Sequence, residues 1–427
     1  FNDERKSYAK IVKSLLPKRR DKNRKDKKGN TILHLACRTG NIALVKIILL
    51  HESVIIDLKN KDDQTILFPA CNSENIDLLK YLIDFHPKLE VNVKDKSKMT
   101  LLHHACKIGN LEIVKYLISL NKIDINAKDK SGNNILHYAS QSGNLQLVDY
   151  LIKQNKIDIT DKNSDMTTVL HFGCESGNLE LVRYLISLKK FNINATNKDM
   201  ETCLHFACKN DSFELVDYLV KFKDIDVTAK DHYNRTILEY SCKLKTSKIA
   251  KYLIGLGKFN LNVVDYSNDT LLHIAAEKGN YELVKYLIDL HQIDITSRNE
   301  DLKTILHKAC QSGNLDLVKY LVELKQFDLK NKTKSKETLL HLATKSNNLE
   351  LLKYLISFNK IDVDAVNDKN ETILHIACNH NNLDLVKYIV KFDEIDITAK
   401  DKYGDNALYN ACLKGNHEIV KYLIELN

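Results

Sequence analysis

The heptapeptide Thr100-Leu-Leu-His-His-Ala-Cys106 is the most informative stretch of the sequence, because closely related stretches recur along the chain at an almost constant interval. Two of them are Thr31-Ile-Leu-His-Leu-Ala-Cys37 and Thr372-Ile-Leu-His-Ile-Ala-Cys378. Self-similarity with a fixed period of this length indicates an array of small structural repeats. The step is 34 residues, with one step of 35, and the histidine position of the twelve copies falls at residues 34, 68, 103, 137, 171, 205, 239, 273, 307, 341, 375 and 409.

Each copy shows the same internal order. A polar stretch such as Asp129-Lys-Ser-Gly-Asn133 predicts a turn. Thr or Asn follows as a helix N-cap, then a short helix that ends at Gly-Asn, as at Gly109-Asn110. In the next segment, Leu111–Ile118, apolar residues recur at positions i, i+3, i+4 and i+7, which predicts a second helix with one buried face.

This pattern resembles the ankyrin repeat family, whose motif is T-P-L-H-x-A on a period near 33. The resemblance covers nearly the whole chain. It implies an all-α repeat solenoid, in which an ankyrin-type stack of helix-turn-helix units carries short β-turn or hairpin fingers. The 34-residue tetratricopeptide repeat matches the period better, but the chain has no Trp and no Pro that recurs once per unit.

The chain departs from the family motif in two ways that bear on its structure. Aliphatic residues such as Ile32 replace the Pro of the motif, which is favourable at a first helical position but not required. The Gly of the turn is lost at Asp63, Met166, Met200 and Leu302. We expect those turns to adopt another turn type or to carry strain.

The repeat divides the chain into two parts. Residues 1–28 are expected to hold a remnant helix of a preceding repeat, around Ile11–Leu16, and a basic linker. Residues 29–427 are expected to form about twelve ankyrin repeats, of which the seventh departs most, with Glu239 in the histidine position and Lys245-Thr246 in place of Gly-Asn. The units start near 26, 60, 95, 129, 163, 197, 231, 265, 299, 333, 367 and 401.

The net charge of +8 comes from residues 1–28, since the rest of the chain holds 52 basic and 52 acidic residues. A neutral array does not favour nucleic acid as the main partner, because that partner needs a basic face. The run Lys18–Lys28 is the exception and is compatible with a nuclear-import signal. No stretch approaches 18 consecutive apolar residues, so we expect no membrane insertion.

Nine of the ten cysteines share one position of the repeat, where Ser140, Ala276 and Thr344 also occur. A position that accepts Cys and Ala is small and buried. Neighbouring repeats are too far apart for disulfides between these positions. Free thiols in this number predict a reducing compartment, so we expect a cytoplasmic protein, with the nucleus as the alternative.

The motif histidines could be mistaken for metal ligands, because a Cys follows most of them by one helical turn. Each pair would need two further ligands, and the position tolerates Phe68, Glu239 and Tyr409. The resemblance implies a structural role instead, in which the histidine ties the helix start to the neighbouring turn. The residues in question are His34, His103, His137, His171, His205, His273, His307, His341 and His375.

Large apolar residues at the predicted turns are the candidate partner-binding residues. All three methionines of the chain fall at turns, and exposed Met suits adaptable binding surfaces. Packing of the turns on one another is the alternative explanation. We centre the candidate site on units five to seven, and the set is Met99, Met166, Met200, Tyr233, Glu239, Leu302 and Tyr403.

Motifs for catalysis or cofactor binding are absent from the sequence, so we expect no enzyme, no cofactor, no metal and no small-molecule substrate. The leading hypothesis is a monomeric protein–protein interaction scaffold that binds partner proteins through its concave helix face and its turns. The alternative is a targeting or interaction segment of a larger enzyme, kinase or channel. Nucleic-acid binding is a third hypothesis that rests only on the basic start.

Overall fold

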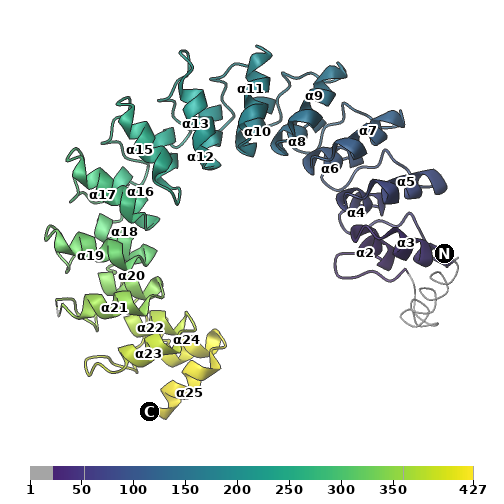
Figure 1. Ribbon diagram of the computed structural model, residues 1–427. Coiled ribbons are helices and arrows are strands. Elements are labelled where there is room, and N and C mark those ends of the chain that lie inside the picture. Colours follow the sequence, from purple (N-terminus) through teal and green to yellow (C-terminus); the bar gives the residue numbers. More distant parts are fainter. Residues whose placement is uncertain (1–22, 52, 359, 427) are drawn as a thin grey trace. The chain divides into compact units, whose positions relative to one another are not determined.

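A computed structural model describes residues 23–51, 53–358 and 360–426 of the 427-residue chain. This part contains 24 helices and no strand, so the predicted all-α repeat fold is confirmed (Figure 1). Four of the turns carry an isolated antiparallel β-bridge, for example between Lys94 and Thr100. The remnant helix expected around Ile11–Leu16 lies outside the described residues.

The chain divides into two compact blocks, Phe1–Ile225 and Asp226–Asn427, which we call the N-terminal and C-terminal blocks. Each block is a stack of helix pairs, one pair per repeat. The first helix of a repeat packs against its own second helix and against the first helix of the next repeat in the block. The boundary falls just before the turn at Asp231 that opens the seventh repeat.

The N-terminal block holds repeats 1 to 6. Its first helices are α2 (Ile32–Arg38), α4 (Leu67–Asn72), α6 (Leu101–Lys107), α8 (Ile135–Gln141), α10 (Val169–Ser176) and α12 (Cys203–Lys209). Its second helices are α3 (Ile42–Leu49), α5 (Ile76–Phe85), α7 (Leu111–Ser119), α9 (Leu145–Lys153), α11 (Leu179–Ser187) and α13 (Phe213–Val220).

The C-terminal block holds repeats 7 to 12. Its first helices are α14 (Ile237–Cys242), α16 (Leu271–Glu277), α18 (Ile305–Ser312), α20 (Leu339–Lys345), α22 (Ile373–Cys378) and α24 (Ala407–Leu413). Its second helices are α15 (Lys248–Gly255), α17 (Tyr281–Asp289), α19 (Leu315–Glu323), α21 (Leu349–Ile356), α23 (Leu383–Ile389) and α25 (His417–Glu425).

These helices are too short to be stable alone. They span six to ten residues, whereas isolated helices below about 12–15 residues are marginal in water. The repeat compensates by burying apolar side chains against its neighbours. In the fourth repeat, for example, Leu136 of α8 and Leu147, Val148 and Leu151 of α9 are fully buried. Each such side chain contributes about 1.5–3 kcal/mol of transfer free energy.

The single 35-residue step lies in the second repeat. Helix α5 has ten residues where α7 has nine, and it ends at His86, whose backbone is no longer helical. The extra residue therefore lengthens α5, since Asp95 follows the end of α5 at the same separation along the chain as Asp129 follows the end of α7, and the turn itself keeps the geometry of the other repeats.

Candidate functional site

Each repeat opens with a tight turn that we call the tip. In the fourth repeat, the Oδ1 atom of Asp129 accepts hydrogen bonds from the N–H groups of Ser131 (2.9 Å) and Asn133 (2.8 Å). The N–H of Asp129 donates to the carbonyl of Asn133 at 3.0 Å and closes the turn. A carboxylate oxygen that accepts a hydrogen bond from the backbone N–H two residues further along the chain stabilises a turn of this kind locally.

All twelve tips keep one residue with left-handed backbone, whether or not it is Gly. Met166 and Met200 have a φ of 59° and Leu302 has a φ of 58°, close to the 77° of Gly132. The tips that lost Gly therefore keep the same turn and carry the strain, which is about 1–2 kcal/mol per residue. The twelve residues are Gly29, Asp63, Lys98, Gly132, Met166, Met200, Asn234, Asn268, Leu302, Lys336, Asn370 and Gly404.

Backbone hydrogen bonds join consecutive tips within each block. In the N-terminal block, the N–H of Lys130 donates to the carbonyl of Ser97 at 2.8 Å, and the N–H of Lys198 donates to that of Asp165 at 2.8 Å. In the C-terminal block, the N–H of Lys334 donates to the carbonyl of Asp301 at 2.7 Å. Because these bonds recur every 34 residues, they hold the tips of a block in a fixed row.

Five of the predicted partner-binding residues are exposed at the tips. In the N-terminal block, Met166 is 43% and Met200 is 50% exposed. In the C-terminal block, Tyr233 is 52%, Leu302 is 44% and Tyr403 is 76% exposed. These side chains are free to touch another molecule, and their role in binding stays a prediction.

The other two predicted residues, Met99 and Glu239, are buried, which corrects their assignment to a partner-binding surface. Met99 is 7% exposed because it directly precedes the N-cap Thr100, one position beyond the left-handed residue of its tip. It lies under Tyr138, whose hydroxyl is 3.7 Å from its sulfur atom. Glu239 is 1% exposed because it lies in the motif histidine position inside α14.

An aromatic cluster at the seventh and eighth tips was missed in part by the sequence analysis. Tyr266 is 64% exposed and lies edge-to-face with Tyr233, with ring centroids 6.1 Å apart. Its hydroxyl donates to the carbonyl of His232 at 3.2 Å. The guanidinium group of Arg235 lies 4.8 Å from the Tyr233 ring centroid and is ion-paired with buried Asp231. An aromatic residue in two neighbouring tips was the signal in the sequence.

Several of the motif histidines link their repeat to the tip of the next one, namely His34, His103, His273, His341 and His375. The Nδ1 atom of His273 accepts from the N–H of the N-cap Thr270 at 3.3 Å, and its Nε2 atom is 3.0 Å from the carbonyl of Lys303 in the next repeat. These two bonds require the neutral ring with its proton on Nε2. Burial favours that form and lowers the pKa of His171 and of His307 to about 4.

A second link between repeats uses the Asn of Gly-Asn, which the sequence analysis interpreted only as the end of a helix. The Oδ1 atom of Asn144 caps α9 by accepting from the N–H of Leu147 at 3.0 Å. Its Nδ2 atom donates to the carbonyl of Gly109 in the preceding repeat at 2.8 Å. Asn178 and Asn314 repeat both bonds. The recurrence of Asn at the repeat period was the signal that could have revealed this role.

The cysteine position is buried as expected for a packing residue. All ten cysteines are free, nine are buried, and Cys412 in the last repeat is exposed. Among the described residues, no three His, Cys, Asp or Glu side chains come together in a way that could hold a metal ion. No described helix is both long and apolar enough to cross a membrane.

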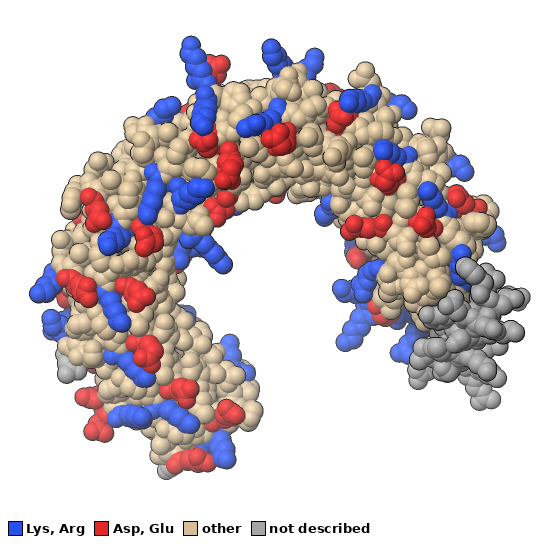
Figure 2. Space-filling model, in the orientation of Figure 1, with Lys and Arg blue, Asp and Glu red and all other residues tan. Residues whose placement is uncertain are grey.

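Charged side chains of both signs are interspersed over the face of the molecule in Figure 2. Within each block, Lys and Arg lie beside Asp and Glu on that face. The basic run Lys18–Lys28 lies outside the described residues up to position 22, and Arg24–Lys28 are exposed.

Tips in a fixed row, paired short helices, and histidine and asparagine links between neighbours define a helical repeat protein. A family model described as ankyrin repeats (3 copies) matches residues 4–95, 85–163, 170–265, 222–299, 272–367 and 340–427. The chain therefore belongs to the ankyrin repeat family. No curated protein matches the chain.

Proposed function

We propose that this chain is a non-catalytic scaffold that binds partner proteins through its exposed tips and the neighbouring surface of its first helices. Ankyrin repeats are generally protein–protein interaction modules, and the family is typically non-catalytic. The tips carry the finer part of the proposal, because they combine exposed apolar side chains with a backbone that hydrogen bonds hold in a fixed row.

The observation that carries this proposal is the choice of residue at the left-handed position. Gly adopts this backbone without strain, whereas Met and Leu do not. Met166 and Met200 in the N-terminal block, and Leu302 in the C-terminal block, combine that strain with large exposed apolar surface. Strain retained at a surface position is compatible with selection for contact with another molecule.

The aromatic cluster of the C-terminal block supports the same function. Aromatic residues and Arg are enriched among the residues that contribute most to protein–protein binding. Tyr233 and Tyr266 are more than half exposed; the Arg235 guanidinium group lies against the Tyr233 ring, and the Tyr266 hydroxyl donates to the carbonyl of His232. A partner would therefore meet rings whose orientation is already set, which lowers the entropic cost of binding.

The experiment that tests the proposal compares proteins captured by the 427-residue chain and by tip variants, measured by quantitative mass spectrometry. We expect Met166→Lys with Met200→Lys, and separately Tyr233→Ser with Tyr266→Ser, to lower the recovery of specific partners by about ten-fold, which corresponds to about 1.4 kcal/mol.

The matched control is Asn370→Lys, which changes the same left-handed tip position in a repeat whose tip is already polar. It should leave capture unchanged, and thermal melting should show that all variants stay folded. Equal capture by the wild type and both double variants would contradict binding through these tips.

We also propose that the protein works in the cytoplasm. The support is chemical, since ten free thiols persist best in a reducing compartment. Microscopy of the tagged chain tests this proposal, and accumulation in the nucleus would favour the basic run Lys18–Lys28 as an import signal instead.

A further inference from the structure

The tyrosines of the second helices are places where this chain binds positive charge. In eight places of the described chain, the cationic group of a Lys or Arg in one second helix lies 4.7 to 6.0 Å from the ring centroid of the tyrosine in the next second helix. Lys251 over Tyr286 and Lys319 over Tyr354 are two of these pairs, at 5.5 and 5.8 Å. A cation at this distance from a ring face is attracted by the quadrupole of the ring.

Tyr320 of the ninth repeat is the exception among the described tyrosines of repeats 8 to 12. Lys285 holds the position from which the basic residue of the preceding repeat would reach it, yet no cation of the described chain lies over the Tyr320 ring. Tyr281, one turn before Lys285 on α17, lies against that ring instead, with centroids 5.6 Å apart and the ring planes at 77°. The Tyr281 position holds Ile or Leu in eight of the other repeats.

A hollow of about 460 Å³ lies beside these two rings, between α17 and α19. Asp316, Tyr320 and Glu323 line it from one face of α19, because they are spaced by four and three residues. Lys319 also lines the hollow, so its charged residues are two carboxylates and one ammonium group, with a formal sum of −1. The hollow thus combines two nearly perpendicular aromatic rings with an excess of negative charge.

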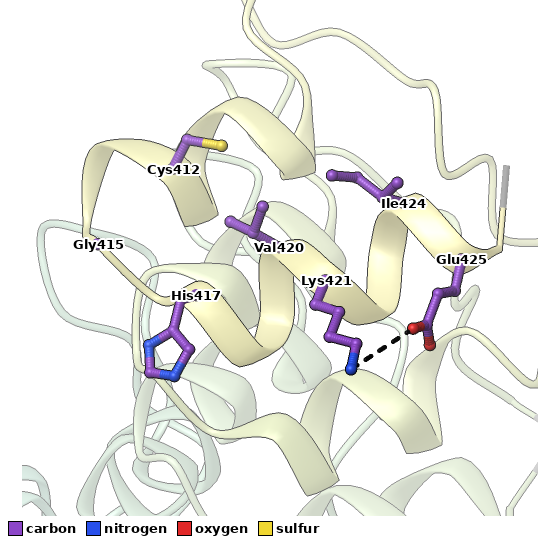
Figure 3. A pocket seen from close by; sticks show the side chains of 7 residues that line it. All are labelled: Cys412, Gly415, His417, Val420, Lys421, Ile424 and Glu425. Atoms are coloured by element: carbon purple, nitrogen blue, oxygen red, sulfur yellow. Dashed lines mark ion pairs between the residues drawn. The ribbon is translucent and has the colours of Figure 1, made fainter.

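The two carboxylates of the hollow have no cation of their own. In the twelfth repeat, Lys421 and Glu425 form an ion pair at 4.0 Å, and they hold the positions of Lys319 and Glu323 (Figure 3). In the ninth repeat, neither Glu323 nor Asp316 makes an ion pair with any residue that the structure describes, and both are exposed. Both carboxylates can therefore attract a cation from another molecule.

The surroundings of Tyr320 favour positive charge. Burial raises the pKa of its hydroxyl group, and the nearby Asp289 and Tyr281 raise it further through their charges. An environment that opposes a negative charge on the ring in this way stabilises a cation beside it. The ammonium group of Lys319 does not fill this place, since it lies 5.8 Å from the ring centroid of Tyr354 in the tenth repeat.

We propose that the hollow between α17 and α19 binds an organic cation, an alkylammonium or guanidinium group, against the rings of Tyr281 and Tyr320. The bound group takes the place of the lysine that other repeats position over this tyrosine. Small quaternary ammonium compounds carry such a group, and so do the Lys and Arg side chains of other proteins. The site lies on second helices, so it is separate from the contacts proposed for the tips.

The test uses ligand-observed NMR with saturation transfer from the 427-residue chain. The first probe is choline, and 3,3-dimethylbutan-1-ol is its neutral counterpart of the same shape. We expect choline to bind with a dissociation constant of about 1–10 mM, and the neutral alcohol to bind at least about five-fold more weakly. The second probe is N-acetylarginine amide. Tighter binding of this probe than of choline assigns the site to a protein side chain, and the reverse assigns it to a small molecule.

Two variants locate the binding in the hollow. Tyr281→Leu introduces the residue of the neighbouring repeats and lets Lys285 reach Tyr320, so choline binding should weaken at least about five-fold. Asp316→Asn combined with Glu323→Gln keeps the side-chain shapes and removes both charges, so choline binding should weaken about three-fold.

The matched control is Tyr116→Leu, which removes a second-helix tyrosine whose ring is already covered by Lys80 at 5.7 Å. It should leave choline binding unchanged, and thermal melting should show that all variants stay folded. Equal binding of choline and the neutral alcohol, no binding of either cation up to about 10 mM, or undiminished binding to Tyr281→Leu overturns the proposal.

Discussion

The seventh and eighth repeats lie side by side in the C-terminal block, and they cap their first helices with different residues. In the eighth repeat, His273 accepts from the N–H of Thr270 and also reaches the carbonyl of Lys303 in the ninth repeat. In the seventh, the Oε2 atom of Glu239 accepts from the N–H of Thr236 at 3.0 Å, but its Oε1 atom is buried with no hydrogen-bond partner. Glutamate therefore keeps the helix cap and loses the link to the next repeat.

The second link is weaker at the same place. Between α14 and α15, Lys245-Thr246 replaces Gly-Asn, and the N-cap Ser247 makes no side-chain hydrogen bond to α15. The Nδ2 atom of Asn280 reaches the carbonyls of Leu244 and Lys245 at 3.4 Å, whereas that of Asn314 reaches Gly279 at 2.8 Å. A residue at a motif position can thus cap the helix of its own repeat and still bond poorly, or not at all, to the neighbouring repeat.

The largest expected effect is a response to acid that differs in sign between the two kinds of repeat. Burial lowers the pKa of His307 from 6.5 to about 4, so the unfolded state takes up a proton first and stability falls as the pH drops below 6.5. A shift of this size corresponds to about 3 kcal/mol. Burial raises the pKa of Glu239 above 4.5, so its contribution is complete below pH 4.5 and is lost as the pH rises through the raised value.

Hydrogen exchange at pH 7 and pH 5 checks this contrast, with intrinsic rates corrected for pH. Protection in α18 should fall at pH 5, while protection in α14 should fall less. Glu239→Gln keeps the shape of the side chain but does not titrate. This variant should remove the difference between α14 and α18 in the loss of protection at pH 5. Equal losses in both helices of the wild type would refute the contrast.

Removal of the motif side chain should cost far more in the eighth repeat than in the seventh. His273→Ala removes the hydrogen bonds to the N–H of Thr270 and to the carbonyl of Lys303, and it opens a cavity. We therefore expect the free energy of unfolding to fall by about 3 kcal/mol. Glu239→Ala also removes a buried carboxylate oxygen that has no partner, so its loss should stay below about 1 kcal/mol. Urea unfolding of both variants measures the difference, and equal losses would show that the two positions are equivalent.

Glu239→His should restore the missing link. Its Nε2 atom would face the carbonyl of Asp269, which corresponds to that of Lys303 in the next repeat. One further hydrogen bond and the loss of an unpaired buried oxygen should stabilise the seventh repeat by about 1–2 kcal/mol. Slower exchange in Lys243–Lys248 would report the gain. His273→Glu is the reciprocal variant, and it should weaken the eighth repeat. If neither substitution changes the stability, the histidine does not stabilise the contact between repeats.

The smallest expected effect concerns the tips. Leu302→Gly removes backbone strain at a φ of 58° and should stabilise the ninth repeat by about 1 kcal/mol. Gly132→Leu in the N-terminal block is the reverse exchange and should destabilise by at least as much, because a Cβ atom there would lie 2.9 Å from the backbone nitrogen of Ser164. Thermal unfolding of both variants measures these shifts, and a loss of stability in Leu302→Gly would mean that its side chain packs on the protein.

The sequence predicted what all copies share and failed where one copy depends on its particular neighbours. Leu136 and the motif histidines recur in equivalent surroundings, so periodicity alone places them in the core. Met99 and Met166 both fall in a turn, yet one position along the chain separates a buried side chain from an exposed one. The unpaired oxygen of Glu239 depends on what the next repeat offers, which no pattern within a single repeat contains.

The extra residue of the second repeat shows which part of the chain sets the alignment of the stack. It lengthens α5, and the next tip still donates from the N–H of Lys96 to the carbonyl of Asp62 at 2.8 Å. Alignment is thus set by tips and helix starts, while the end of the second helix can vary in length. Insertions placed at the end of the second helix of other repeats should lengthen the chain without shifting any neighbour out of register, which makes this point suitable for grafted loops or tags.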